Sequence, residues 1–193
     1  MATLTHNTRY PCVFDLKFLR WERYTSEKNR NSDIKTVTLG EPYTLWVEYC
    51  MALRVGNRVL YQSEKDTTLI LEDIKHLIED LRRLAHGKKD RIVFHPIEPD
   101  FELSICKITE SNASVIVSSI SKMRAKTSAG ATDPSSLFSV NVWIDYPNQV
   151  NHFYGGCGPA LNFFVEALDI ERFTSQLEAE LKALGSYFNG PEE

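Results

Sequence analysis

Residues 43–55, YTLWVEYCMALRV, show the clearest regular pattern in the chain. Apolar side chains occupy every second position from Tyr43 to Val55, which is the period of a β-strand with one buried face. Gly56 and Asn57 follow, and both residue types tolerate the positive φ angles of a tight turn. We therefore predict a long strand here, with a hairpin partner that returns over residues 58–62.

Two other segments have the spacing of amphipathic helices. Over residues 70–85 the apolar side chains fall on one helical face, acidic residues lead, basic residues trail, and Gly87 supplies a stop. The second stripe starts at Ile170, directly after Asp169 as an expected N-cap, and it ends at Gly185. We predict a helix at each place.

Several shorter stretches have the composition or alternation of strands. They cover residues 10–24, 91–95, 101–107, 114–120, 137–145 and 161–167. Strands outnumber helices and do not alternate with them, which argues against a doubly wound parallel sheet. We predict an α+β fold in one domain over residues 1–193: mainly an antiparallel sheet or sandwich with two amphipathic helices packed on it. Residues 1–9 should be loose, and residues 186–193 should form a polar tail.

Composition excludes some functional classes. The formal net charge is −4, a poor match for a general nucleic-acid binder, which needs cations to displace phosphate counterions. No apolar run approaches the length of a membrane span, and the first twelve residues lack the apolar segment of a signal peptide. The four cysteines occur singly, which favours reduced thiols. We expect a cytoplasmic protein that contacts neither membrane nor nucleic acid.

The most enzyme-like stretch is GGCG at residues 155–158. Glycine amides could stabilise an oxyanion there, Cys157 could be a nucleophile, and His152 could be its base. A third, orienting group has no visible source in the sequence, and a turn with an incidental cysteine explains the run equally simply. We expect no catalytic residues, although a cysteine hydrolase remains an alternative.

A second candidate lies in the turn-like segment HPIEPD at residues 95–100. His95, Glu98 and Asp100 are residue types that bind metals, but their spacing matches no short ligand motif. Glu98 could instead anchor the turn or contact a partner. The chain also has no Walker loop and no GxGxxG motif, so we expect no metal and no cofactor, with a metal-dependent hydrolase kept as an alternative.

Aromatic residues gather around the irregular segment after residue 142. Aromatics close to His and Asp are typical of protein interfaces, whereas Trp143 and Phe153 could equally be core residues at the end of a sheet. The side chains that we expect to contact another protein are Asp145, Tyr146, His152 and Tyr154.

Four segments, taken in order, resemble the WapI-like immunity proteins, a family of small cytosolic bacterial proteins linked to toxin neutralisation. These segments are TLWVEYCMALRVGNRVLYQ (44–62), ILEDIKHLIEDLRRLAHG (70–87), IVFHPIEPDFELSICKI (92–108) and LDIERFTSQLEAELKAL (168–184). The positions that match the family pattern are Trp46, Leu77, Leu81, Glu98, Pro99, Phe101 and Leu103.

The resemblance covers residues 43–184 and carries over no catalytic residues. It implies a non-enzymatic protein-binding module that neutralises a toxin by occluding its active surface, with an acidic patch facing a basic one. The longer N-terminal portion, the loop at 126–136 and the glycine-rich stretch depart from the family pattern. A phage- or plasmid-encoded inhibitor of a host defence system is the alternative within the binding class. The sequence specifies neither the partner nor the oligomeric state.

Overall fold

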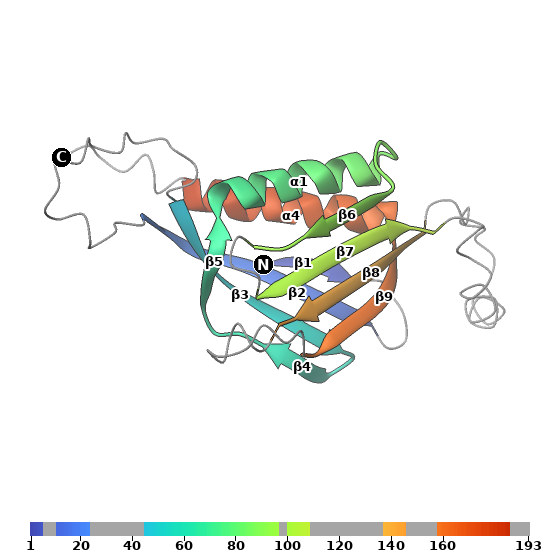
Figure 1. Ribbon diagram of the computed structural model, residues 1–193, viewed down its shortest axis with the longest axis horizontal. Coiled ribbons are helices and arrows are strands. Elements are labelled where there is room, and N and C mark those ends of the chain that lie inside the picture. The colour runs from blue at the N-terminus through green and yellow to red at the C-terminus, as the bar shows by residue number, and fades with distance from the viewer. Residues whose placement is uncertain (6–10, 24–44, 97–99, 109–136, 146–157, 186–193) are drawn as a thin grey trace, which may run out of the picture.

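The computed structural model describes residues 1–5, 11–23, 45–96, 100–108, 137–145 and 158–185. These residues form two antiparallel sheets and two helices, α1 (Leu71–Ala85) and α4 (Ala167–Gly185), so the predicted α+β class is confirmed. The sheets face each other, and the two helices lie side by side across one edge of the pair (Figure 1).

The first sheet is built around the segment that decides the fold. Its strands are β1 (Ala2–Thr5), β2 (Cys12–Arg23), β3 (Leu45–Val55), β4 (Arg58–Gln62) and β5 (Asp66–Ile70). β3 lies between β2 on one side and both β4 and β5 on the other. The predicted long strand and its hairpin return are therefore confirmed as β3 and β4, and Gly56 in the turn has a φ of 56°. The short strand β5 was not predicted.

The second sheet contains β6 (Arg91–Phe94), β7 (Phe101–Lys107), β8 (Leu137–Ile144) and β9 (Ala160–Glu166). These strands lie in chain order, so β6 and β9 form the two edges of the sheet. Four predicted strands are confirmed here to within one residue. The strand predicted at 114–120 lies outside the described residues.

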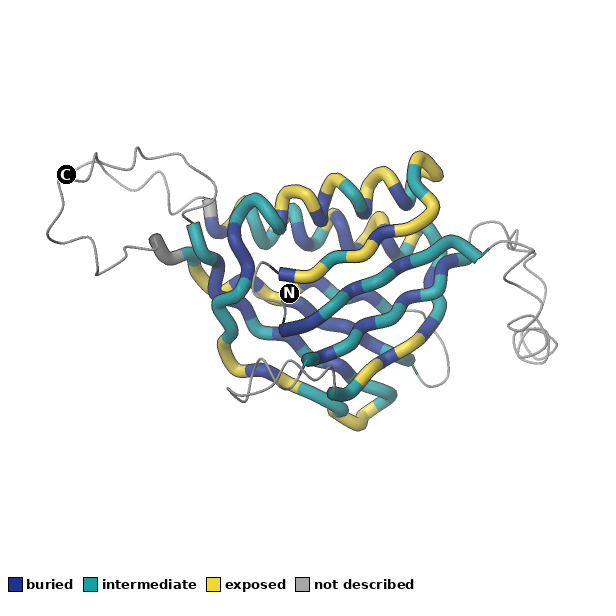
Figure 2. Tube along the Cα trace, viewed as in Figure 1, coloured by how far each residue is buried: buried dark blue, intermediate teal, exposed yellow. Residues whose placement is uncertain are grey.

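One hydrophobic core joins both sheets and both helices (Figure 2). The ring of Phe101 on β7 lies 6.3 Å from that of Phe14 on β2 and 6.0 Å from that of Tyr49 on β3. Phe14 also lies 5.9 Å from Phe173 of α4. The alternation predicted for β3 is seen directly, because Val47, Tyr49, Met51 and Leu53 are all buried.

Both helices begin with the same local arrangement. The Asp73 carboxylate accepts the backbone N–H of Ile70 at 3.3 Å, and the Asp169 carboxylate accepts that of Glu166 at 3.1 Å. Each aspartate is the third residue of its helix, the position from which an acid satisfies a free N–H and favours the helix dipole. The prediction that Asp169 is the N-cap was wrong by three residues, since α4 begins at Ala167 and Glu166 precedes it.

The expectation of a loose N-terminus is wrong for residues 2–5. They form β1, pair with β2, and bury Ala2 and Leu4 completely. The Thr3 N–H donates to Oε1 of Gln176 on α4 at 2.7 Å, and the N-terminal amine pairs with Glu180. Only two alternating apolar residues mark this strand, and part of its stabilising contacts come from α4 at the other end of the sequence.

Replacing Leu81 of α1 by alanine should strongly destabilise the fold. Leu81 is fully buried in the shared core, so the loss of packing and the cavity left behind should lower the free energy of unfolding by about 2–5 kcal/mol. Leu168 of α4 is 60% exposed and provides the matched control, with an expected loss within about 0.5 kcal/mol for Leu168→Ala. Urea unfolding of both variants measures the difference, and equal losses would contradict this placement of the core.

Candidate partner-binding surface

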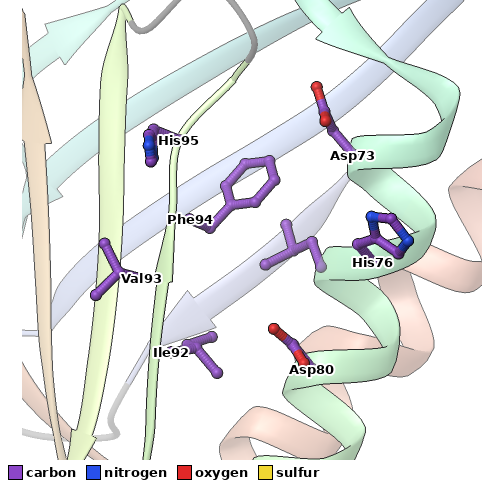
Figure 3. Close-up of a pocket in the computed structure, with 8 residues that line it drawn as sticks. Asp73, His76, Asp80, Ile92, Val93, Phe94 and His95 are labelled. Carbon is purple, nitrogen blue, oxygen red and sulfur yellow. The ribbon is translucent and has the colours of Figure 1, made fainter. Parts of the chain in front are cut away.

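An open groove of about 200 Å³ runs between α1 and the edge strand β6. The two elements run in opposite directions, so Asp73 lies at the same end as His95, and Asp80 at the same end as Ile92 (Figure 3). The lining residues are Asp73, His76, Leu77, Asp80, Ile92, Val93, Phe94 and His95. The groove therefore combines an apolar base with a polar wall that α1 supplies.

The α1 side of this groove is acidic. The first ten residues of the helix contain four carboxylates and one lysine. Glu72 lies 3.2 Å from Nε2 of His76 and 4.0 Å from Nζ of Lys75, and Asp80 lies 2.6 Å from Nζ of Lys89. Negative charge therefore predominates at the end of the groove where the helix starts.

The strand β6 has one open side among the described strands. Lys107 donates its N–H to the carbonyl oxygen of Asp90 at 2.7 Å, which fixes the hydrogen-bonding register between β6 and β7. Bonded residues alternate along an antiparallel strand, so Ile92 and Phe94 face β7, while the N–H and C=O groups of Arg91 and Val93 point away from it. No described strand pairs with that side.

The edge of the first sheet at β1 is bonded by a helix side chain. The N–H of Thr3 points away from β2 and is bonded by Gln176, so α4 covers this edge. On β6, by contrast, the Val93 side chain is 45% exposed. Sheet edges normally need cover or charged side chains to prevent pairing with another chain. In the described part of the chain, β6 has a charged residue only at its start, Arg91, and α1 lies beside this edge with the groove between them.

A buried group of polar side chains connects the two sheets. The Tyr49 hydroxyl donates to Oδ2 of Asp100 at 2.7 Å and lies 2.6 Å from Oγ1 of Thr68. Asp100 is 4% exposed, and its burial raises the pKa of its carboxyl to about 6, although the hydrogen bonds from Tyr49 and Thr68 oppose this shift. Burial also raises the pKa of Asp66 and that of the Tyr49 hydroxyl.

The described residues among the predicted contacts lie at one end of the second sheet. Asp145 follows β8, and its N–H donates to the carbonyl oxygen of Asp100 at 2.9 Å. His95 follows β6 and is exposed in the groove. Asp100 is a buried structural link instead of an accessible ligand. The other predicted residues, Glu98, Tyr146, His152, Tyr154 and Cys157, lie outside the described residues.

The carboxylates at this end do not assemble a metal site. Asp66, Asp100 and Asp145 each have one buried carboxylate oxygen without a hydrogen-bond partner. Within the described ranges, no group of three His, Cys, Asp or Glu side chains has an arrangement that could hold a metal ion. The same ranges contain no helix with the length and apolarity required to cross a membrane.

The sequence analysis missed two buried carboxylates on the outer face of the first sheet. Glu48 is 3% exposed and contacts Arg20 at 2.5 and 2.8 Å and Lys65 at 2.6 Å. The hydrogen bond from Arg20 is the main reason that the pKa of Glu48 falls to about 2. Asp15 is held similarly by Arg54 and Thr3. Most of the partners come from other strands, and Lys65 comes from the connection between β4 and β5, so no local spacing reveals these pairs.

The family of this protein follows from a comparison with known sequence families. The model described as the Immunity protein WapI-like family matches residues 7–185. The chain belongs to the WapI-like immunity protein family. The predicted resemblance is therefore confirmed, and the match includes α1, β6 and the groove between them. No curated protein and no solved structure matches the chain.

We expect Asp100→Asn to change how stability depends on pH. The folded-state pKa of about 6 is above the ordinary value of 3.8, so the charged carboxylate is disfavoured in the folded state. The contribution of the Asp100 carboxyl to the free energy of unfolding is therefore present below pH 4 and is lost as the pH rises through 6. The free energy of unfolding of the wild type, relative to Asp100→Asn, should therefore fall between pH 4 and 7.

Glu48→Gln should show the opposite pH dependence in the same urea titrations. Its pKa of about 2 is below the ordinary value of 4.5, so its stabilising contribution is present above pH 4.5 and is lost as the pH falls toward 2. The free energy of unfolding of the wild type, relative to that of Glu48→Gln, should therefore increase as the pH rises from 2 to 4.5. A pH-independent difference for either variant would contradict the environment assigned to that carboxylate.

Proposed function

We propose that this protein binds a toxin protein in the cytoplasm and neutralises it by covering the surface that the toxin needs for its activity. The observation that carries this proposal is membership of an immunity protein family across nearly the whole chain. The mechanism is steric, because the described residues offer a binding surface and the proposal requires no bond-making step.

The acidic side of α1 favours a basic surface on the toxin. Complementary charges steer two proteins together and select the correct partner more than they increase final affinity. Glu72 and Asp73 lie in the first turn of α1, and Asp73 is at the same end of the groove as exposed His95. A toxin that acts on a nucleic acid would present such a basic surface, because phosphate binding requires cations.

The groove supplies only part of the contact area that stable binding requires. A specific protein complex buries about 800 Å² on each partner. The outer face of the second sheet adjoins β6, and in it Val93, Ser104, Asn141 and Asn162 follow one another across the strands. This row contains no charge, and Trp143 lies half-buried on the same face. We include this face in the proposed interface.

The predicted contacts next to this face form part of the same proposal. Asp145 directly follows β8, and Tyr146, His152 and Tyr154 come after it in the sequence. Simultaneous replacement of all four side chains by alanine should weaken binding if they contact the toxin.

The experiment requires a toxin domain, which is to be sought among the genes that adjoin the gene for this chain. Inducible expression of that domain in a bacterial host should stop growth, and co-expression of this chain should restore it. With purified proteins, toxin activity should fall in proportion to added chain and reach its minimum at a fixed molar ratio. Stoichiometric titration is expected for an inhibitor that acts by occlusion.

The same titration distinguishes the alternatives. An enzyme that modifies the toxin would inactivate it at far below molar equivalence, and this outcome would overturn the proposal. Failure of the folded chain to bind the toxin or restore growth would also overturn it. If the chain instead binds a host defence protein and protects an invading phage from it, the alternative of a phage- or plasmid-encoded inhibitor would be correct.

A further inference from the structure

We infer that β6 receives an extended segment of the toxin as an additional strand of the second sheet, with that segment seated in the groove beside α1. This inference rests on the proposed function and specifies how the partner is bound. It requires a partner segment in β conformation that carries a basic side chain.

The backbone of β6 supplies the first requirement. Arg91 and Val93 each direct one N–H and one C=O toward the side where no described strand pairs. Strand addition uses such groups as main-chain donors and acceptors, and the neighbouring pockets select side chains. Arg91 and Val93 are both exposed, so a partner can reach these groups without rearrangement of β7.

The dimensions of the groove supply the second requirement. A strand added to β6 directs alternate side chains toward α1, and these recur about every 6.6–6.8 Å. Asp73 and Leu77 are four residues apart on α1, which corresponds to about 6 Å along the helix axis. A segment could therefore place one side chain at Asp73 and the side chain two positions away on the apolar surface of Leu77.

The charge of the wall decides the chemistry of that segment. Asp80 pairs with Lys89 at one end of the wall, and Asp73 lines the groove at the other end, next to Glu72, which contacts Lys75 and His76. A lysine or arginine suits this end, and an apolar residue suits the Leu77 position. The expected occupant is thus a toxin segment with a basic and an apolar residue separated by one position.

A pair of substitutions at one residue tests the main-chain contacts. Val93→Pro removes an N–H that points away from β7, whereas Val93→Ala shortens the side chain and retains the N–H. With the neighbouring-gene toxin as ligand, Val93→Pro should weaken binding by about tenfold or more, and Val93→Ala by less than about threefold. Calorimetric titration measures both affinities, and unfolding curves establish that each variant is folded.

Hydrogen exchange on the wild-type complex gives an independent result if Val93→Pro fails to fold. The amides of Arg91 and Val93 should exchange more slowly when the toxin is bound. Unchanged exchange at both amides would overturn the inference, as would undiminished binding by a folded Val93→Pro variant. If the chain still neutralises the toxin in these cases, only strand addition is wrong. Absence of any binding by the wild type would instead overturn the proposed function.

The charge requirement has a matched control in the second helix. Asp73→Asn and Asp169→Asn remove the same charge from the same helical position, and an asparagine oxygen can still accept the N–H bonded there. Only Asp73 lines the groove. Asp73→Asn should slow association several-fold and reduce its dependence on salt, whereas Asp169→Asn should not. Equal effects of the two substitutions would show that the basic side chain binds elsewhere.

Discussion

The contact between Phe101 and the rings of Phe14 and Tyr49 holds the two sheets together. Phe101 is the first residue of β7, so this packing fixes β7 and, through its pairing with β7, also fixes β6. It also draws the preceding residue, Asp100, into the space between the sheets, where the Tyr49 hydroxyl bonds its carboxylate. The apolar contact and the buried carboxylate are thus two parts of one arrangement.

The position of α1 follows from the same arrangement. Ile92 of β6 and Leu77 and Leu81 of α1 are all buried in the core, so the two elements share buried surface. Their polar sides remain beside one another and enclose the groove. The proposed binding surface therefore lies over the shared hydrophobic core, so its geometry is formed before binding. Such preorganisation lowers the entropic cost of association.

The regular elements could be predicted because their patterns are long. The alternation through β3 and the apolar stripe of α1 each extend over more than ten residues, so a few exceptions do not hide the period. β1 and β5 are only four and five residues long, and they depend on contacts with distant segments. Asp169 was recognised as a helix-start residue, but its side chain acts from the third position instead of the N-cap.

The candidate site was less accessible to sequence reasoning. His95 was selected as a polar residue in a turn, but nothing in the sequence places it opposite Asp73, because their proximity depends on how β6 packs against α1. The open side of β6 depends on strand order, which periodicity does not encode. In the same way, the alternation through β3 predicts that Glu48 faces solvent. In the fold, Arg20 of β2 and Lys65 from the connection before β5 contact it.

The pairing of β1 with α4 has a consequence for the timing of folding. The Gln176 side chain bonds the N–H of Thr3 at the outer edge of β1, although the two residues are separated by 173 positions in the sequence. During synthesis on a ribosome, β1, β2 and β3 emerge long before α4, so the first sheet must wait in an incomplete state with an unsatisfied border. Helix α4, which follows all the other described elements in the chain, thus completes the edge of β1, and the nascent chain is most exposed to mispairing until α4 has emerged.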